Sequence, residues 1–325
     1  MNMKRFALMT VFVLSATAVV DVSCNKDKEH FVGIENISFE NYPKVDGSTS
    51  ARALNQMIAF KLLDVRYEWV EPIPSLAIYE WKLFSNEQDV PKEYRDFFWQ
   101  HIKTSQTHGA FMNLIDGEAD IILTHRTISP DEKAYADNAG VTFIEPSIAL
   151  DAFIFIVNKN NPVKSLTVEQ IQNIYTGKIT NWSQVGGNNT NIQVFTRPRN
   201  SGSEEVFREL VMDGLEPLDF PESAIGDMTR LFYEVMEEED GICYIFNNYK
   251  DWIVRIPDNI VPKIAINGIF PNENTVKNRT YPFIAEVHVA IRSDLDRHSM
   301  AYKLYEWLQS ENAISTIKEC GFIPK

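Results

Sequence analysis

The stretches Asp120-Ile-Ile-Leu-Thr124 and Ala152-Phe-Ile-Phe-Ile-Val157 decide the fold class, because each is a short apolar run with the length of a buried β-strand. Similar runs occur at 192–195, 242–245, 263–266 and 286–291. Apolar residues at three- and four-residue spacing predict helices over 51–63, 167–175, 204–212, 228–238 and 300–311. This alternation predicts an α/β architecture with largely parallel sheets, in which ligands bind beyond the carboxyl ends of the strands.

Length and charge limit the class of protein further. The chain has 325 residues and 44% hydrophobic residues, which suits two globular domains. Its formal net charge of −14 argues against nucleic acid and anionic membrane surfaces as partners. A small anion remains possible, because local backbone N–H groups and one guanidinium outweigh distant, screened carboxylates.

The N-terminal segment is typical of a lipoprotein signal peptide. Two basic residues precede an apolar run from Phe6 to Val20, and a small residue directly precedes Cys24. We expect residues 1–24 to form the signal peptide with a lipidated Cys24, followed by a polar tether over residues 25–33. A free buried cysteine is the alternative. The protein is therefore expected to be exported and lipid-anchored, on the periplasmic side of a membrane or on an outer surface.

Three clusters of small hydroxyl residues and glycine each lead into an apolar-periodic segment. They are Asp46-Gly-Ser-Thr-Ser50, Thr104-Ser-Gln-Thr-His-Gly109 and Arg197-Pro-Arg-Asn-Ser-Gly-Ser203. Glycine allows a ligand to approach the backbone closely, and the first turn of a following helix has unpaired N–H donors. A tetrahedral oxyanion needs convergent donors from several loops, and these three clusters could supply them.

Helix capping is the alternative interpretation of each cluster, since serine and threonine are preferred N-cap residues in any protein. Ser201 and Glu204 have the S-x-x-E spacing of a capping box. The same type of spacing recurs at Ser129 with Glu132 and at Thr167 with Gln170. The third cluster differs by Arg197, a permanent cation that can form a bidentate pair with an oxyanion. Both interpretations remain open from composition alone.

Enzyme signatures are absent from the sequence, which has no G-x-S-x-G, G-x-x-x-x-G-K-[ST] or H-E-x-x-H motif. His108 and His125 lie near the clusters, where a metal or general-base role competes with simple packing or hydrogen bonding. No catalytic residue, metal or cofactor is predicted. The aromatic-rich segment 69–100 is left unassigned, and it could be a docking surface, a lid or a satellite apolar cluster.

Several stretches resemble one known family. They are Gly117-Glu-Ala-Asp-Ile-Ile-Leu-Thr-His-Arg126, the strand 151–158, the segment 166–182, the loop 197–207, Gly241-Ile-Cys-Tyr244, Tyr281-Pro282 and Cys320-Gly-Phe-Ile-Pro324. Together they resemble the phosphate-specific, PstS-like substrate-binding proteins of ABC importers. The resemblance runs from about Ile37 to Ile323.

The resemblance implies a type II periplasmic-binding-protein fold, in which two α/β domains are joined by two crossover strands and enclose a ligand cleft. The crossovers would lie near 149–155 and 281–287. Domain I would comprise 34–150 plus 284–325, and domain II would comprise 151–283. The two remaining cysteines would then fall in different domains, where a disulfide would obstruct closure, so both are expected to be thiols.

The resemblance also implies the ligand site. Its oxyanion-binding residues would be Thr49, Ser50, Thr107, His125, Arg126, Arg197, Ser201, Gly202 and Ser203. His125-Arg126 stands where the family has an aspartate, or a serine followed by arginine. The aspartate accepts the proton of hydrogen phosphate, a proton that sulfate lacks. Our hypothesis is that neutral His125 or nearby Asp46 supplies this acceptor, with Arg197 or Arg126 balancing the charge.

The implied function is capture of inorganic phosphate and its delivery to the membrane subunits of an ABC importer, by a monomer without chemistry on the ligand. Membrane contact would be through the lipid anchor only. One alternative keeps the fold and changes the ligand to molybdate, tungstate, sulfate or a phosphorylated small molecule. Another is a surface interaction lipoprotein with a vestigial cleft.

Overall fold

The computed structural model describes residues 31–71, 80–220 and 223–325, and residues Val32–Lys325 form one compact unit. The predicted signal peptide, Cys24 and most of the predicted tether lie outside the described residues. Across the described ranges, no helix has the length and apolar character that a membrane crossing requires.

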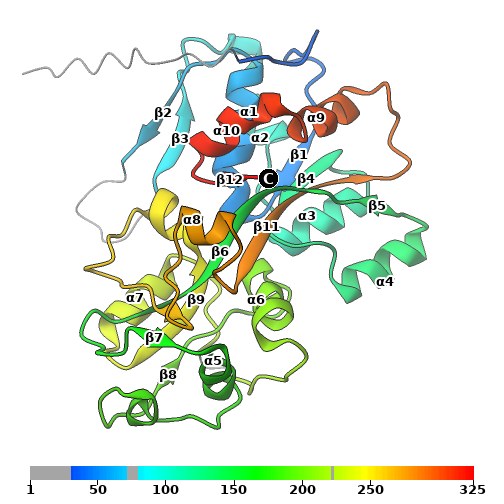
Figure 1. Cartoon of the computed structure of the whole chain (residues 1–325). Helices are drawn as coiled ribbons and strands as arrows, with labels where there is room; N and C mark the ends of the chain where they lie inside the picture. The colour runs from blue at the N-terminus through cyan, green and yellow to red at the C-terminus, as the bar shows by residue number, and fades with distance from the viewer. Residues whose placement is uncertain (1–30, 72–79, 221–222) are drawn as a thin grey trace, which may run out of the picture. The chain divides into compact units, whose positions relative to one another are not determined.

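An eight-stranded sheet with the order β1-β4-β11-β6-β9-β8 forms the framework, with β12 paired to β6 and β5 paired to β11 (Figure 1). Its strands are β1 (Val45–Gly47), β4 (Ile121–Thr124), β5 (Phe143–Ile144), β6 (Ser147–Val157), β8 (Gln193–Val194), β9 (Gly241–Phe246), β11 (Ile284–Arg292) and β12 (Ile323–Pro324). Two small sheets pair β7 (Ser165–Leu166) with β10 (Ala265–Ile266), and β2 (Tyr67–Val70) with β3 (Lys82–Ser85).

The strand β6 connects the two ends of this sheet. Its first half pairs antiparallel with β11, from Ala152 opposite Ile284 to Ser147 opposite His288. Its second half, from Phe153 onward, pairs with β9 instead. The predicted crossovers at 149–155 and 281–287 thus fall within β6 and across the start of β11. The division into two domains stays a prediction.

The sheet is mixed, so the prediction of largely parallel sheets is wrong. The pairs β1–β4, β8–β9 and β7–β10 are parallel, whereas β4–β11, β11–β6 and β6–β9 are antiparallel. Alternating strands and helices along the chain do not reveal which strands become neighbours. Here two long antiparallel strands, β6 and β11, occupy the centre.

The helices largely follow the predicted apolar periods. They are α1 (Arg52–Leu62), α2 (Phe97–His101), α3 (Gln106–Ile115), α4 (Pro130–Ala139), α5 (Val168–Tyr175), α6 (Gly202–Val206), α7 (Arg230–Glu237), α8 (Glu273–Lys277), α9 (Met300–Leu308) and α10 (Ile314–Glu319). Shorter turns are the 3₁₀ segments η1 (Thr49–Ala51), η3 (Lys92–Tyr94), η4 (Trp182–Val185) and η8 (Glu311–Ala313), and the π-helical segments η5 (Phe207–Met212) and η7 (Tyr249–Val254). The predicted helix 204–212 is therefore α6 followed by η5.

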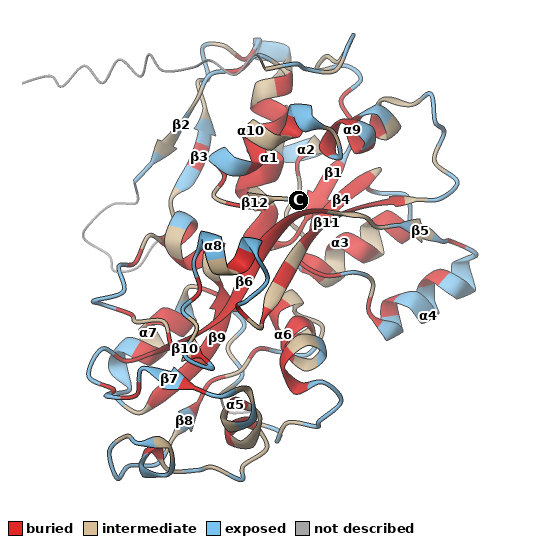
Figure 2. Cartoon of the chain, viewed as in Figure 1, coloured by how far each residue is buried: buried red, intermediate tan, exposed pale blue. Residues whose placement is uncertain are grey.

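The strands β6 and β9 are buried on both faces, which accounts for their unbroken runs of apolar residues. Nearly every residue of both strands is buried, as Figure 2 shows, because helices such as α7 and α8 pack on them. A strand covered on both faces needs apolar side chains at every position rather than at alternate ones. Cys243 in β9 and Cys320 after α10 are free and buried, as expected.

Parallel pairing brings distant loops to one edge of the sheet. Because β1 and β4 are parallel, the residues 48–50 that follow β1 lie near the residues 125–126 that follow β4. The helix α3 packs against both strands and also contacts α6, which follows the loop that begins at Arg197. All three hydroxyl-rich clusters therefore meet beyond the carboxyl ends of strands.

The aromatic segment, unassigned from sequence, includes the β2–β3 hairpin, which lies against η7 and the residue after it. The backbone N–H of Trp81 donates to the carbonyl of Ile253 at 2.7 Å. The guanidinium of Arg255 lies 3.8 Å from the ring centroid of Trp81 and 5.0 Å from that of Trp69. These cation–π contacts hold the hairpin to a segment far away in the sequence.

Candidate functional site

The three clusters converge on a cavity of about 30 Å³. Its lining consists of Ser48, Thr49, Ser50, Gln106, Thr107, Arg197, Ser201, Gly202, Ser203, Met228 and Phe246. Seven of the nine predicted ligand residues are in this set, while His125 and Arg126 are not. Ser48 and Gln106 belong to the quoted clusters, but nothing in the sequence around Met228 or Phe246 indicates a site.

Helix capping shapes two of these loops. Ser48 precedes η1 and its Oγ accepts the backbone N–H of Ala51 at 3.3 Å. Ser201 precedes α6 and its Oγ accepts the backbone N–H of Glu204 at 3.3 Å. Since an accepting hydroxyl keeps its own proton, each serine is a cap and can still donate to a ligand. The two interpretations of the clusters are therefore compatible.

The capping box at Ser201 is only half formed. The carboxylate of Glu204 does not accept a hydrogen bond from the backbone N–H of Ser201. That N–H donates to the carbonyl of Pro198 instead. Glu204 accepts from Arg208 Nε at 2.7 Å and from the hydroxyl of Tyr244. By contrast, the boxes at Ser129 and Thr167 are complete.

Gly202 allows the second and third loops to approach each other. A Cβ atom at this position would lie 2.3 Å from Thr107 Oγ1 and 3.3 Å from Thr107 Cβ. Non-bonded heavy atoms do not approach so closely without displacement, so any side chain at Gly202 would separate the loops. A glycine is needed at this position because the two loops lie so close together, and not because the backbone has a positive φ angle.

Arg197 is the cation of the cavity. The residue is 8% exposed, and its Nη1 donates to the carbonyl of Ile225 at 2.6 Å. Its Nε is buried and has no hydrogen-bond partner among the described residues. Among the described residues, no carboxylate forms an ion pair with it. Burial lowers the pKa of Arg197, while Tyr244, Tyr249 and Asp227 oppose that shift. An anion in the cavity would supply the missing negative charge.

Arg126 is placed differently from the prediction. It does not line the cavity, and its guanidinium forms a bidentate ion pair with Glu132, with two N–O distances of 2.7 Å. Glu132 comes from the complete capping box of α4 and also lies 2.9 Å from His108 Nδ1. Burial alone raises the pKa of Glu132, but Arg126, the Ser129 N–H and His108 together lower it. The charge of Arg126 is thus already balanced within the protein.

His125 also lies behind the cavity wall rather than in it. Its side chain is fully buried, and its ring packs against Phe246 and Phe322 at centroid distances of 4.3 and 5.5 Å. Its Nδ1 lies 2.8 Å from Ser50 Oγ, and Ser50 does line the cavity. His125 can therefore act on a ligand through Ser50, or through Ser48, whose Oγ lies 3.5 Å from Nδ1.

Asp46, the other hypothesised acceptor, is engaged in holding the loops together. Its Oδ1 accepts the backbone N–H groups of Gly47 at 2.7 Å and Ser105 at 2.8 Å. Its Oδ2 accepts from Asn113 Nδ2 at 2.6 Å. The residue is fully buried and is not part of the cavity lining, so it connects the first loop to the second.

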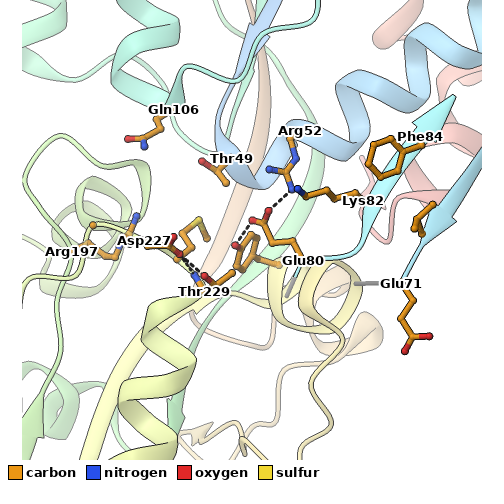
Figure 3. Close-up of a pocket in the computed structure, with 14 residues that line it drawn as sticks. Thr49, Arg52, Glu71, Glu80, Lys82, Phe84, Gln106, Arg197, Asp227 and Thr229 are labelled. Atoms are coloured by element: carbon orange, nitrogen blue, oxygen red, sulfur yellow. Dashed lines mark hydrogen bonds and ion pairs between the residues drawn. The ribbon is translucent and has the colours of Figure 1, made fainter. Parts of the chain in front are cut away.

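A larger cavity of about 720 Å³ adjoins the first and shares Thr49, Gln106, Arg197 and Met228 with it (Figure 3). Its remaining lining is Arg52, Val70, Glu71, Glu80, Lys82, Phe84, Gly226, Asp227, Thr229 and Tyr249. We call the two spaces the inner and the outer cavity. Within the part of the chain that the structure describes, no group of three His, Cys, Asp or Glu side chains is arranged to hold a metal ion.

Glu80 is one of the acidic residues that line the outer cavity. It pairs with Arg52 at 2.5 Å and accepts a hydrogen bond from the hydroxyl of Tyr249, so it joins α1 to η7. Asp227, on another part of the wall, accepts from the backbone N–H and the hydroxyl of Thr229. Unlike the inner cavity, the outer cavity contains both acidic and basic side chains.

An α/β framework with polar loops gathered around a buried arginine, beyond the carboxyl ends of its strands, defines a binding protein for a small polar ligand. The family model described as PBP superfamily domain matches residues 87–312, which is more than half of the chain. The chain belongs to this superfamily.

Curated relatives are similar over much of the chain. Protein SphX of Synechococcus elongatus is 26% identical over 236 residues, covering 69% of this chain and 68% of the relative. The phosphate-binding protein PstS of Bacillus subtilis is 26% identical over 183 residues, covering 56% and 57% respectively. PstS of Staphylococcus epidermidis is 30% identical over 186 residues, covering 54% of each chain.

Solved structures share the fold. A phosphate-bound structure from Clostridium perfringens has a TM-score of 0.60 at 23% identity and covers 89% of this chain and 99% of that one. An ABC-type phosphate transport receptor from Vibrio cholerae has a TM-score of 0.58 at 24% identity, with coverages of 86% and 98%. The predicted type II periplasmic-binding-protein fold is confirmed.

Proposed function

We propose that this chain is the extracytoplasmic binding protein of an ABC importer and that it captures inorganic phosphate in the inner cavity. One observation carries the proposal: Arg197 is a buried cation that has no described acidic partner and lies among six hydroxyl side chains. A buried charge without compensation is costly. An anion that enters the inner cavity removes this cost.

The number of donors is sufficient for useful affinity. A hydrogen bond to a charged group contributes about 1.5–3 kcal/mol, and micromolar binding requires about 8 kcal/mol. Arg197 together with a few hydroxyl groups from the three loops reaches that range. The inner cavity is much smaller than the outer one, about 30 Å³ against about 720 Å³, so it suits a small inorganic ion better than an organic molecule.

Relatives support the choice of ligand and partner, since several bear the name phosphate-binding protein and one similar structure is a phosphate transport receptor. The proposal includes a lipid anchor at Cys24, a monomeric state and two domains with boundaries near 150 and 284. It also includes delivery of unchanged phosphate to the importer's membrane subunits, without catalysis.

A second candidate is a phosphorylated small molecule. It is favoured by the outer cavity, which shares four lining residues with the inner one and is large enough for an organic group. In this case the phosphoryl group would contact Arg197, and the organic part would lie near Arg52 and Tyr249. Another oxyanion, such as molybdate, tungstate or sulfate, remains an alternative ligand for the inner cavity.

A thermal-shift panel followed by calorimetry separates these candidates. The panel contains phosphate, arsenate, sulfate, molybdate, tungstate and several phosphate monoesters, each tested with the full chain. We expect phosphate to give the largest shift. A larger shift with a monoester would favour the second candidate, and a larger shift with another oxyanion would change the ligand. No shift with any of them would indicate the interaction lipoprotein with a vestigial cleft.

A further inference from the structure

Ser50, His125 and Asp151 form a linear arrangement that starts at the inner cavity and ends in the protein interior. Ser50 Oγ lies 2.8 Å from His125 Nδ1. On the opposite side of the ring, His125 Nε2 lies 3.6 Å from Asp151 Oδ2 and has no hydrogen-bond partner within the part of the chain that the structure describes. All three residues are at most 5% exposed.

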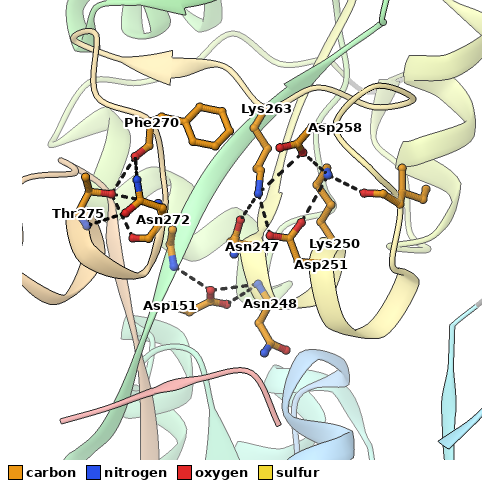
Figure 4. Close-up of polar contacts among 12 residues, drawn as sticks. Asp151, Asn247, Asn248, Lys250, Asp251, Asp258, Lys263, Phe270, Asn272 and Thr275 are labelled. Carbon is orange, nitrogen blue, oxygen red and sulfur yellow. Dashed lines mark hydrogen bonds and ion pairs between the residues drawn. The ribbon is translucent and has the colours of Figure 1, made fainter. Parts of the chain in front are cut away.

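Asp151 is a buried carboxylate held by backbone donors. Its Oδ1 accepts from Ala152 N at 2.8 Å and from Asn248 N at 3.1 Å, and the same Asn248 N–H lies 3.3 Å from Oδ2 (Figure 4). No lysine or arginine of the described ranges forms an ion pair with it. The side chain of His125 is therefore the basic group that faces Asp151.

This placement favours one of the two neutral tautomers of His125. A carboxylate 3.6 Å from Nε2 favours an N–H at that atom, and a small approach converts the contact into a hydrogen bond. In neutral imidazole the other nitrogen, Nδ1, then has a lone pair and acts as an acceptor. At 2.8 Å, the hydroxyl of Ser50 is the donor to Nδ1.

The consequence concerns the lone pairs of Ser50. A serine hydroxyl has one proton and two acceptor positions, and here the proton is directed away from the cavity toward His125. Ser48 Oγ, at 3.1 Å, can donate to one acceptor position. Because Ser50 lines the inner cavity, the remaining position is available to a ligand. Ser201 differs, because its Oγ accepts the backbone N–H of Glu204 and retains its own proton for donation.

We infer that Ser50, oriented by His125 and Asp151, is the hydrogen-bond acceptor that selects oxyanions bearing a proton over oxyanions without one. Hydrogen phosphate and arsenate donate to Ser50. Sulfate and selenate place an oxygen lone pair against it. The inference rests on the proposed oxyanion function and names the residue that discriminates. His125 is a positioning residue, since it does not line the cavity.

The test is calorimetry at mildly alkaline pH with phosphate, arsenate, sulfate and selenate, using the full chain and three variants. Ser50→Ala removes the acceptor. His125→Phe retains an aromatic ring against Phe246 and Phe322 but frees the hydroxyl proton of Ser50 for the ligand. His298→Phe, at an exposed position, is the control.

We expect Ser50→Ala to weaken phosphate and arsenate binding by about 10- to 100-fold, the range of one charged hydrogen bond, and to leave sulfate within about threefold. In His125→Phe, phosphate binding weakens while sulfate and selenate binding tightens. His298→Phe changes neither. Equal weakening of all four anions in His125→Phe would mean that His125 only supports the loop, and would overturn the inference.

Two further outcomes separate the inference from the proposed function. Wild-type protein that binds sulfate as tightly as phosphate contradicts the inference and leaves an oxyanion-binding function in place. Wild-type protein that binds no anion contradicts the proposed function itself.

Nitrogen-15 NMR of the histidine rings measures the tautomer of His125 directly and needs no variant. The Nε2–H tautomer of His125 is expected, and the Nδ1–H tautomer would overturn the assignment.

Discussion

Two buried arginines near the inner cavity have similar sequence surroundings and different partners. Arg126 precedes the S-x-x-E box of Ser129 and Glu132, and Arg197 precedes the S-x-x-E box of Ser201 and Glu204. Glu132 turns back to Arg126 and neutralises it. The position of the glutamate, rather than that of the arginine, decides which cation remains available for a ligand.

Glu204 does not neutralise Arg197 because two other groups already bind its carboxylate. Arg208, one helical turn further along, pairs with Glu204 at 2.7 Å, and Tyr244 donates its hydroxyl from β9. Arg197 therefore lies at the cavity without a described carboxylate in ion-pair contact. The comparison assigns Arg126 to the stability of the fold and Arg197 to the ligand.

The largest expected effect is on folding. Arg126→Ala leaves Glu132 buried without its partner, which typically destabilises a protein by about 3–5 kcal/mol. Urea unfolding measures this loss, while the phosphate affinity of the folded fraction stays near that of the wild type. The double variant Arg126→Met with Glu132→Leu is the matched control and should lose less than Arg126→Ala alone. A large loss of affinity with little loss of stability would reverse the assignment.

Arg197→Ala is expected to have the opposite profile. Phosphate binding should weaken by about 2–5 kcal/mol, or roughly 30- to 5,000-fold, since the anion loses its cation. Stability should change little, because the substitution removes a buried charge without a described carboxylate partner. Calorimetry measures the phosphate affinity and urea unfolding measures the stability. The variant Arg199→Ala, at an exposed position, is the control. Normal phosphate affinity in Arg197→Ala would exclude this residue from the site.

Gly202→Ala tests whether the loops around Arg197 must be in close contact. The added methyl group meets Thr107 Oγ1 at 2.3 Å, so the second and third loops separate and phosphate affinity falls by about tenfold, or 1.4 kcal/mol. The double variant Gly202→Ala with Thr107→Val replaces the hydroxyl by a methyl group and should not recover affinity. Gly202→Ala with Thr107→Ser, which removes a methyl group and restores room to rotate, should recover part of it. Unchanged affinity in Gly202→Ala would show that the contact is irrelevant.

The smallest effect is a dependence of stability on pH. Because the folded-state pKa of Glu132 is lowered, its contribution is present above the ordinary pKa of glutamate and is lost as the pH falls through the folded-state pKa. The free energy of unfolding should therefore decrease less steeply with acidification in Glu132→Gln than in the wild type. If the free energy of unfolding of the two proteins decreases equally steeply at acidic pH, Glu132 does not stabilise the fold through its charge.

Much of the fold follows from local sequence. The helix α1 and the strands β6 and β9 could be predicted because their apolar residues recur at helical spacing or form continuous runs. The strand order could not, since β11 joins β4 and β6 through pairing over long sequence separations. The place of the β2–β3 hairpin against η7 could not be predicted either, because Arg255, which contacts Trp81, is far away in the sequence.

The candidate site divides in the same way. The three hydroxyl-rich clusters could be found from sequence, and the fold brings them to one cavity. The roles of Arg126 and His125 could not, because they depend on tertiary partners: Glu132 for the first, Asp151 and Ser50 for the second. Met228 and Phe246 complete the cavity through packing alone.

The most direct test of the central claim is a crystal structure with bound arsenate, in which the anomalous signal of arsenic locates the ion. The account predicts arsenic in the inner cavity, with its oxygens at hydrogen-bond distance from the Arg197 guanidinium and one of them against Ser50 Oγ. Arsenic beside Arg126, or in the outer cavity away from Arg197, would contradict it.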